Sequence, residues 1–134
     1  MRFILTLLAA TVIASAAAAQ ESALASLHFD AREAALNAEA LAGLDRSMAP
    51  LRQISGTWSL TVTGHADPSE GEPKETDALS DRRARVVRDA LVARGVPASL
   101  ITTMARGASH PAAGASGPGD NRRVEITIGR GSGR

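Results

Sequence analysis

Apolar and polar residues alternate with a period of two in short segments of the chain, and this pattern predicts β-strands. The clearest strand spans 58–63, where apolar side chains fall on one face and hydroxyl-bearing side chains on the other. A last strand is expected over 124–128, where valine and isoleucine alternate with glutamate and threonine. Two shorter segments, 26–29 and 100–105, complete the set of expected strands.

Two other segments carry apolar residues at helical spacing. The first helix is expected to begin after Asn37, a suitable N-cap, and to end or kink near Ala49 because Pro50 follows. The second should run from about Asp77 to Arg94 and be closed by Gly95, which adopts the left-handed cap conformation without strain. The order β-α-β-α-β-β predicts an α/β two-layer sandwich with two main helices on one face of a small mixed four-stranded sheet.

Residues 1–19 have the pattern of a secretory signal peptide. Arg2 supplies a charged start, a short apolar core follows, and Ala17 and Ala19 are the small residues that precede a cleavage site. The apolar core is shorter than the ~20 residues that a membrane-spanning helix needs, so no transmembrane segment is expected in the mature chain. We therefore expect an exported, soluble, periplasmic protein.

Residues 20–134 are expected to form a single domain, with a core over about 26–129. The segment 107–121 is rich in glycine, alanine, serine and proline, which predicts a mobile surface loop. The sequence has no cysteine. Without a thiol we expect no disulfide, no thiolate zinc site, no cysteine nucleophile and no lipid anchor.

Composition excludes several further classes of function. The chain has 15 Lys and Arg residues against 14 Asp and Glu, so its charge does not favour a nucleic-acid or anionic-lipid partner. His65 and Asp67 could be considered as a metal pair, but two ligands are too few and only three histidines exist. No Gly-x-Ser-x-Gly motif accompanies the histidines. We expect no enzyme activity, no metal and no cofactor.

One arginine of the second helix is predicted to point inward. On a helical wheel of about 100° per residue, Arg83 falls within the apolar arc, whereas Arg82, Arg85 and Arg88 point away. A buried guanidinium has to be paired, either inside the protein or with the anion of a ligand. Asp67, expected where the strand over 58–63 gives way to a loop, could accept hydrogen bonds from an ammonium while Arg83 donates to a carboxylate in bidentate fashion. A direct Asp67–Arg83 salt bridge without ligand fits the sequence equally well.

The motifs of the chain resemble those of the OmpA-like peptidoglycan-binding domain, in order, from about Leu27 to Ile128. They are Gly64-His65-Ala66-Asp67, Leu79-Ser80-Asp81-Arg82-Arg83-Ala84, Gly95-Val96-Pro97, Gly107, Pro111 and Asn121-Arg122-Arg123-Val124-Glu125-Ile126. The resemblance implies the same β-α-β-α-β-β sandwich. It also implies that Asp67 and Arg83 together hold the diaminopimelate residue of the peptidoglycan stem peptide without forming a covalent bond.

The same segment departs from the family pattern at several positions. Ala66 stands where the family has threonine and Thr76 where it has asparagine. We call Asp67 and Arg83 the clamp. One extra residue separates them compared with the family pattern, so that Gly71 falls one place late in the Asp-x-x-Gly turn. Arg32 occupies a polar position near the first strand that often contributes to the site. Arg32, Thr76 and His65 are therefore candidates for secondary ligand contacts.

Two hypotheses remain open for the function. The first is peptidoglycan binding through diaminopimelate in the cell envelope. The second is a structural or interaction protein with the same fold and a degenerate pocket. Such a protein would contact an outer-membrane or periplasmic partner through the arginine-rich helix face or the loop over 107–121.

Overall fold

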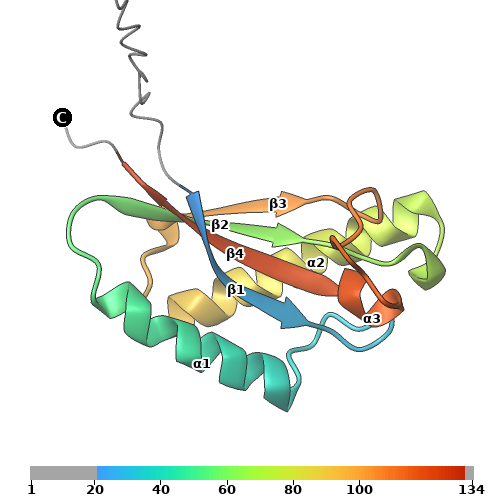
Figure 1. The fold of residues 1–134 in the computed structure, drawn as a ribbon, viewed down its shortest axis with the longest axis horizontal. Coiled ribbons are helices and arrows are strands. Elements are labelled where there is room, and N and C mark those ends of the chain that lie inside the picture. Colours follow the sequence, from blue (N-terminus) through green and yellow to red (C-terminus); the bar gives the residue numbers. More distant parts are fainter. Residues whose placement is uncertain (1–20, 132–134) are drawn as a thin grey trace, which may run out of the picture.

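Four strands form one mixed sheet in the spatial order β1-β4-β2-β3 (Figure 1). The computed structural model describes residues 21–131, so the predicted signal peptide over 1–19 lies outside the described residues. The central strands are β4 (Arg123–Arg130) and β2 (Trp58–Gly64), which pair antiparallel. On the outside, β1 (Glu21–His28) pairs antiparallel with β4, and β3 (Ile101–Ala105) pairs parallel with β2.

Two long helices, α1 (Ala38–Arg52) and α2 (Pro73–Ala93), lie on the same face of this sheet (Figure 1). Three short helical turns occur in the connections: η1 (Pro68–Glu70), η2 (Ala98–Leu100) and α3 (Pro118–Asn121). The predicted fold class, a two-layer sandwich of two main helices on a mixed four-stranded sheet, is confirmed. None of the helices in residues 21–131 is long and apolar enough to cross a bilayer.

The hydrophobic core lies between the sheet and the helices. Alternation along the strands directs every second side chain into it, as the period-two pattern predicts. The residues with no exposed surface in this layer come from both central strands and both helices: Leu44, Leu60, Val62, Ala84, Val87, Leu91, Val124 and Ile126. Burial of this apolar surface is the main favourable term for the fold.

The boundaries of α1 agree with its predicted start and differ at its end. The Asn37 side chain accepts a hydrogen bond from the Ala40 amide at 2.8 Å, which confirms the N-cap. The sequence predicts that the helix ends or kinks near Ala49. The helix continues through Pro50 to Arg52, so the predicted end is wrong. A proline removes only its own N–H donor, and the residues after it still close the last turn.

The second helix begins four residues before its predicted start. Pro73 is its first residue, where a missing N–H costs nothing because the first amides of a helix have no partner within it. The carbonyl of Glu72 accepts from the amides of Glu75 and Thr76 at 2.8 and 2.9 Å. Periodicity alone did not reveal this polar first turn, which carries no apolar stripe.

The predicted surface loop over 107–121 is more structured than its composition suggests. It ends in α3, and the Asn121 side chain accepts a hydrogen bond from the Ala112 amide at 2.9 Å. Asn121 therefore links the end of this segment to its middle.

Candidate functional site

The site begins where β2 passes close to α2. A Cβ atom on Gly64 would lie 1.9 Å from the carbonyl oxygen of Ser80, so no other residue fits at this position. The Ser80 hydroxyl in turn accepts a hydrogen bond from the Gly107 amide at 2.9 Å. The end of β2, the middle of α2 and the start of the loop after β3 are thus brought together.

Beyond Gly64 the chain leaves the strand but remains hydrogen-bonded. The amide of His65 donates to the Arg123 carbonyl and that of Ala66 to the Gly107 carbonyl, both at 2.8 Å. Asp67 follows as the N-cap of η1. The strand predicted over 58–63 ends one residue later, at Gly64, so Asp67 lies three residues beyond the last paired residue of β2 and not at the strand end itself.

Asp67 is buried at the end of this segment, with only 6% of the residue exposed. Its Oδ2 accepts from the amide of Ser69 at 2.9 Å and also from the Ser69 hydroxyl, and its Oδ1 accepts from Asn121 Nδ2 at 2.7 Å. Burial acts to raise the pKa of Asp67, but these hydrogen bonds and the nearby charge of Arg122 outweigh it and lower the pKa. A carboxylate oxygen can accept about two hydrogen bonds, so Oδ1 has capacity for a further donor.

Arg83 is fully buried, as the helical wheel predicts. Its guanidinium carbon lies 5.3 Å from the centre of the Phe29 ring, a distance at which the cation is attracted to the ring face. Three of its hydrogen bonds go to backbone carbonyls: Nε to Glu33 at 2.8 Å, Nη1 to His65 at 3.1 Å and Nη2 to Asp30 at 3.2 Å. Arg83 thereby joins the segment after β1 to the end of β2.

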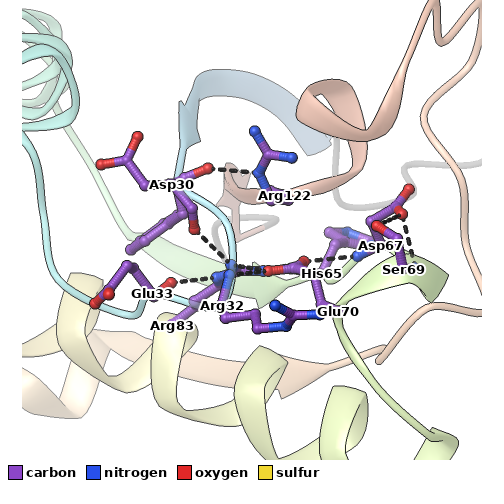
Figure 2. A network of polar contacts seen from close by, with 10 residues as sticks. Asp30, Arg32, Glu33, His65, Asp67, Ser69, Glu70, Arg83 and Arg122 are labelled. Carbon is purple, nitrogen blue, oxygen red and sulfur yellow. Dashed lines mark hydrogen bonds and ion pairs between the residues drawn. The ribbon is translucent and has the colours of Figure 1, made fainter.

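The charge partner of Arg83 is Glu70, which the sequence analysis did not identify. Glu70 Oε1 and Oε2 accept from Nη1 and Nη2 of Arg83 at 2.8 and 2.5 Å, in bidentate geometry (Figure 2). The expected alternative of an Asp67–Arg83 salt bridge is therefore wrong. In Figure 2 the two residues lie on opposite sides of Glu70, and the Asp67 carboxylate turns toward Ser69.

Glu70 is also bound by two backbone amides. The amide of Asp67 donates to Oε1 and that of Arg32 to Oε2, both at 2.8 Å. Burial opposes ionisation of Glu70, but the hydrogen bonds from Arg83, Asp67 and Arg32 outweigh it and lower the pKa of this carboxyl. A signal for this residue was present in the sequence, since a capping residue followed three positions later by glutamate is the pattern of a capping box.

The three predicted secondary residues occupy different surroundings. Thr76 is buried and its hydroxyl donates to the Pro73 carbonyl at 3.1 Å. Arg32 has an exposed side chain and a positive φ of 59°, a conformation that directs its amide to Glu70. His65 is buried, and neither ring nitrogen has a hydrogen-bond partner among the described residues; its Nε2 lies 3.6 Å from Glu125 Oε2.

A cavity of about 480 Å³ opens beside this network. It lies between the turn after Asp67, the first turn of α2 and the loop after β3, and its lining includes Pro68, Thr76, Asp77 and Ser109. Within residues 21–131, no cluster of three or more His, Cys, Asp or Glu side chains is arranged to hold a metal ion. The arrangement offers the Asp67 carboxylate, a cavity beside it and the buried guanidinium of Arg83.

Two of the three outward-pointing arginines of α2 are paired with neighbouring carboxylates. Arg85 pairs with Asp81 at 2.9 Å and Arg88 with Asp89 at 3.0 Å. Such exposed pairs are common on helices and contribute little to stability. This face therefore carries no feature that sets it apart as a binding surface.

Comparison with known proteins gives consistent matches. The sequence profile of the OmpA family matches residues 28–125. The peptidoglycan-associated lipoprotein of Rhizobium meliloti (strain 1021) is 37% identical over 87 residues, which are 65% of this chain and 48% of that protein. Outer membrane protein A of Yersinia pseudotuberculosis serotype I (strain IP32953) is 40% identical over 87 residues, 64% of this chain and 24% of that protein. The chain thus spans about half the length, or less, of these curated relatives.

Solved structures with a similar fold include the OmpA-like domain of FopA1 from Francisella tularensis subsp. tularensis SCHU S4. It superposes with a TM-score of 0.65 at 26% identity, covering 78% of this chain and 70% of that one.

Proposed function

The chain belongs to the OmpA family, as its motifs indicated, and on this premise we propose that it binds peptidoglycan non-covalently through the diaminopimelate residue of the stem peptide. The observation that carries the proposal is that Glu70 accepts hydrogen bonds from both the Asp67 amide and the Arg83 guanidinium, so that one buried network holds Asp67 and Arg83 on either side of it. Relatives named as peptidoglycan-associated lipoproteins support the choice of ligand.

The ligand's charges match the charges of the site. Diaminopimelate carries an ammonium and a carboxylate on the same end of its side chain. Asp67 would accept the ammonium at Oδ1, which has capacity for another donor, and Arg83 would hold the carboxylate through its planar fork. The cavity lined by Pro68 and Thr76 would accept the neighbouring part of the stem peptide. Arg32, whose exposed side chain is close in sequence to the carbonyls bound by Arg83, would contact its rim.

We propose that this binding takes place in the periplasm, where the protein associates with the cell wall. The predicted signal peptide over 1–19 would direct export, and the relatives' names refer to peptidoglycan and to the outer membrane. The role is one of attachment, and no step of chemistry on the ligand is proposed.

A second candidate is an envelope interaction protein with a degenerate pocket. Two observations favour it: Ala66 lacks the hydroxyl of the family threonine, and Glu70 already fills the fork of Arg83. Its partner would be an outer-membrane or periplasmic protein, recognised without use of Asp67.

Co-sedimentation of the purified protein with diaminopimelate-type sacculi separates these candidates. Peptidoglycan binding predicts that the protein pellets with sacculi and that a free diaminopimelate-containing stem peptide competes. Asp67→Ala should abolish pelleting, whereas Asp89→Ala, which removes an exposed carboxylate on α2, should pellet like the wild type. Arg83→Lys, which keeps the charge and loses the bidentate fork, should also fail to pellet while remaining folded. Undiminished pelleting of both site variants would exclude the clamp.

A further inference from the structure

We infer that Glu70 is an internal occupant of the Arg83 site, so that a ligand carboxylate reaches Arg83 only by displacing the Glu70 side chain. This inference rests on the proposed function, because it concerns the carboxylate arm of the same clamp. It assigns to Glu70 the role of a residue that sets affinity and selects which ligands can bind.

The contacts of Glu70 are those expected of a bound carboxylate. Both oxygens face the guanidinium, at 2.8 and 2.5 Å, and each also accepts one backbone amide, from Asp67 and from Arg32. Bidentate pairing with an arginine fork is the usual way in which proteins hold a carboxylate of a ligand. Glu70 belongs to η1, three residues after Asp67, whereas Arg83 belongs to α2. Glu70 is only 6% exposed.

Arg83 has no donor left for a second carboxylate. A guanidinium carries five N–H groups, and those of Arg83 go to Glu33, His65, Asp30 and the two oxygens of Glu70. A ligand carboxylate placed beside Glu70 would bring two like charges together without gaining a hydrogen bond. Binding to Arg83 and the Glu70 contact therefore exclude each other.

Exchange of one carboxylate for another is nevertheless feasible at this position. Glu70 is the last residue of η1, a turn whose other residues, Pro68 and Ser69, are exposed. Gly71 follows with φ of 148°, in a region of backbone conformation that glycine reaches without strain. Rotation about Gly71 can carry Glu70 toward solvent, and the amides of Asp67 and Arg32 then become donors for the incoming carboxylate.

This competition has a direct energetic consequence. Only the fraction of molecules in which Glu70 has left Arg83 can bind a ligand carboxylate there, and the apparent affinity for such a ligand is reduced by that fraction. A ligand that brings a carboxylate together with an ammonium for Asp67 compensates for the lost contact. A ligand with a carboxylate and no ammonium has to displace Glu70 without gaining the contact to Asp67, so Glu70 makes the site select against such ligands.

The first arm of the test measures binding of a diaminopimelate-containing stem peptide by calorimetry. Glu70→Ala should bind at least about tenfold more tightly than the wild type, because it removes the internal competitor. Glu75→Ala is the matched control. It removes an exposed glutamate from the first turn of α2, five residues after Glu70, and changes the net charge equally. Glu70→Gln keeps the side-chain volume and should show the same direction of change if Glu70→Ala does not fold.

The second arm measures thermal unfolding in acetate and does not depend on peptidoglycan. Glu70→Ala should melt below the wild type, because Arg83 is left buried without its partner. Acetate should then raise its melting temperature, relative to chloride at equal ionic strength, by occupying the vacated fork. The wild type and Glu75→Ala should show no such difference.

The two arms distinguish the possible failures. If the wild type binds the stem peptide and Glu70→Ala binds no more tightly, the inference is overturned and the proposed function stands. If no variant binds but acetate selectively stabilises Glu70→Ala, the proposed function fails and Arg83 is still an exchangeable carboxylate site. Absence of any acetate effect on Glu70→Ala would overturn the inference independently.

Discussion

At the scale of single residues, the buried arginine explains most of the geometry of the site. A guanidinium with no exposed surface is tolerated only when it is paired, and Arg83 meets this condition through Glu70 and three carbonyls. Helical periodicity predicted that Arg83 points inward, and this is confirmed. The identity of its partner could not be predicted from periodicity, because it depends on how the η1 turn folds back over α2.

His65 is a second buried polar residue, and its titration gives a test of the structure by pH. Burial lowers the pKa of His65 from 6.5 to about 4, helped by the charge of Arg123 and partly opposed by Glu125. The unfolded chain therefore binds a proton more readily than the folded one. Stability from this residue is complete above pH 6.5 and is lost as the pH falls from 6.5 toward about 4.

Chemical denaturation at a series of pH values between 7.5 and 4.5 measures this effect. The free energy of unfolding of the wild type should fall across this window, and the fall should be smaller for His65→Phe. His28→Ala removes an exposed histidine and should retain the wild-type slope. An equal slope in the wild type and His65→Phe would show that His65 titrates normally in the folded protein.

At the scale of elements, the contact between β2 and α2 positions both halves of the site. Alternation along the strand predicted β2, and helical spacing predicted most of α2, because each of these two elements has a continuous apolar face. They did not predict the first turn of α2, which is polar, or the helical turn α3, whose composition is typical of a loop. The closeness of β2 and α2 was also not predictable, since it depends on the absence of a side chain at one position, Gly64.

Substitution of Gly64 by alanine tests that contact. The added methyl group would lie 1.9 Å from the Ser80 carbonyl, so the strand and helix must move apart. Overpacking of this kind lowers the free energy of unfolding by about 1–3 kcal/mol or more. Gly117→Ala has open space around the new Cβ and an extended backbone, and urea denaturation should show it within about 0.5 kcal/mol of the wild type. Similar stability for both variants would contradict the close approach.

At the scale of the whole molecule, segments far apart in the sequence meet at one end of the sheet. The residues after β1, the end of β2, the middle of α2 and the start of β4 all contribute hydrogen bonds to the network around Arg83 and Asp67. The family motifs predict Asp67 and Arg83 as site positions because the motifs occur in order along the chain. Glu70 follows three residues after Asp67, in the pattern of a capping box, but its pairing with Arg83 depends on the fold of η1 and could not be predicted from the motifs.

The most direct measurement compares two stem peptides that differ at one residue, diaminopimelate or lysine. Lysine retains the ammonium for Asp67 and lacks the carboxylate for Arg83. Calorimetry should show that the diaminopimelate peptide binds at least about tenfold more tightly, and that Asp67→Ala binds neither peptide. Equal affinity for the two peptides, or binding that does not change in Asp67→Ala, would contradict recognition of peptidoglycan by Asp67 and Arg83.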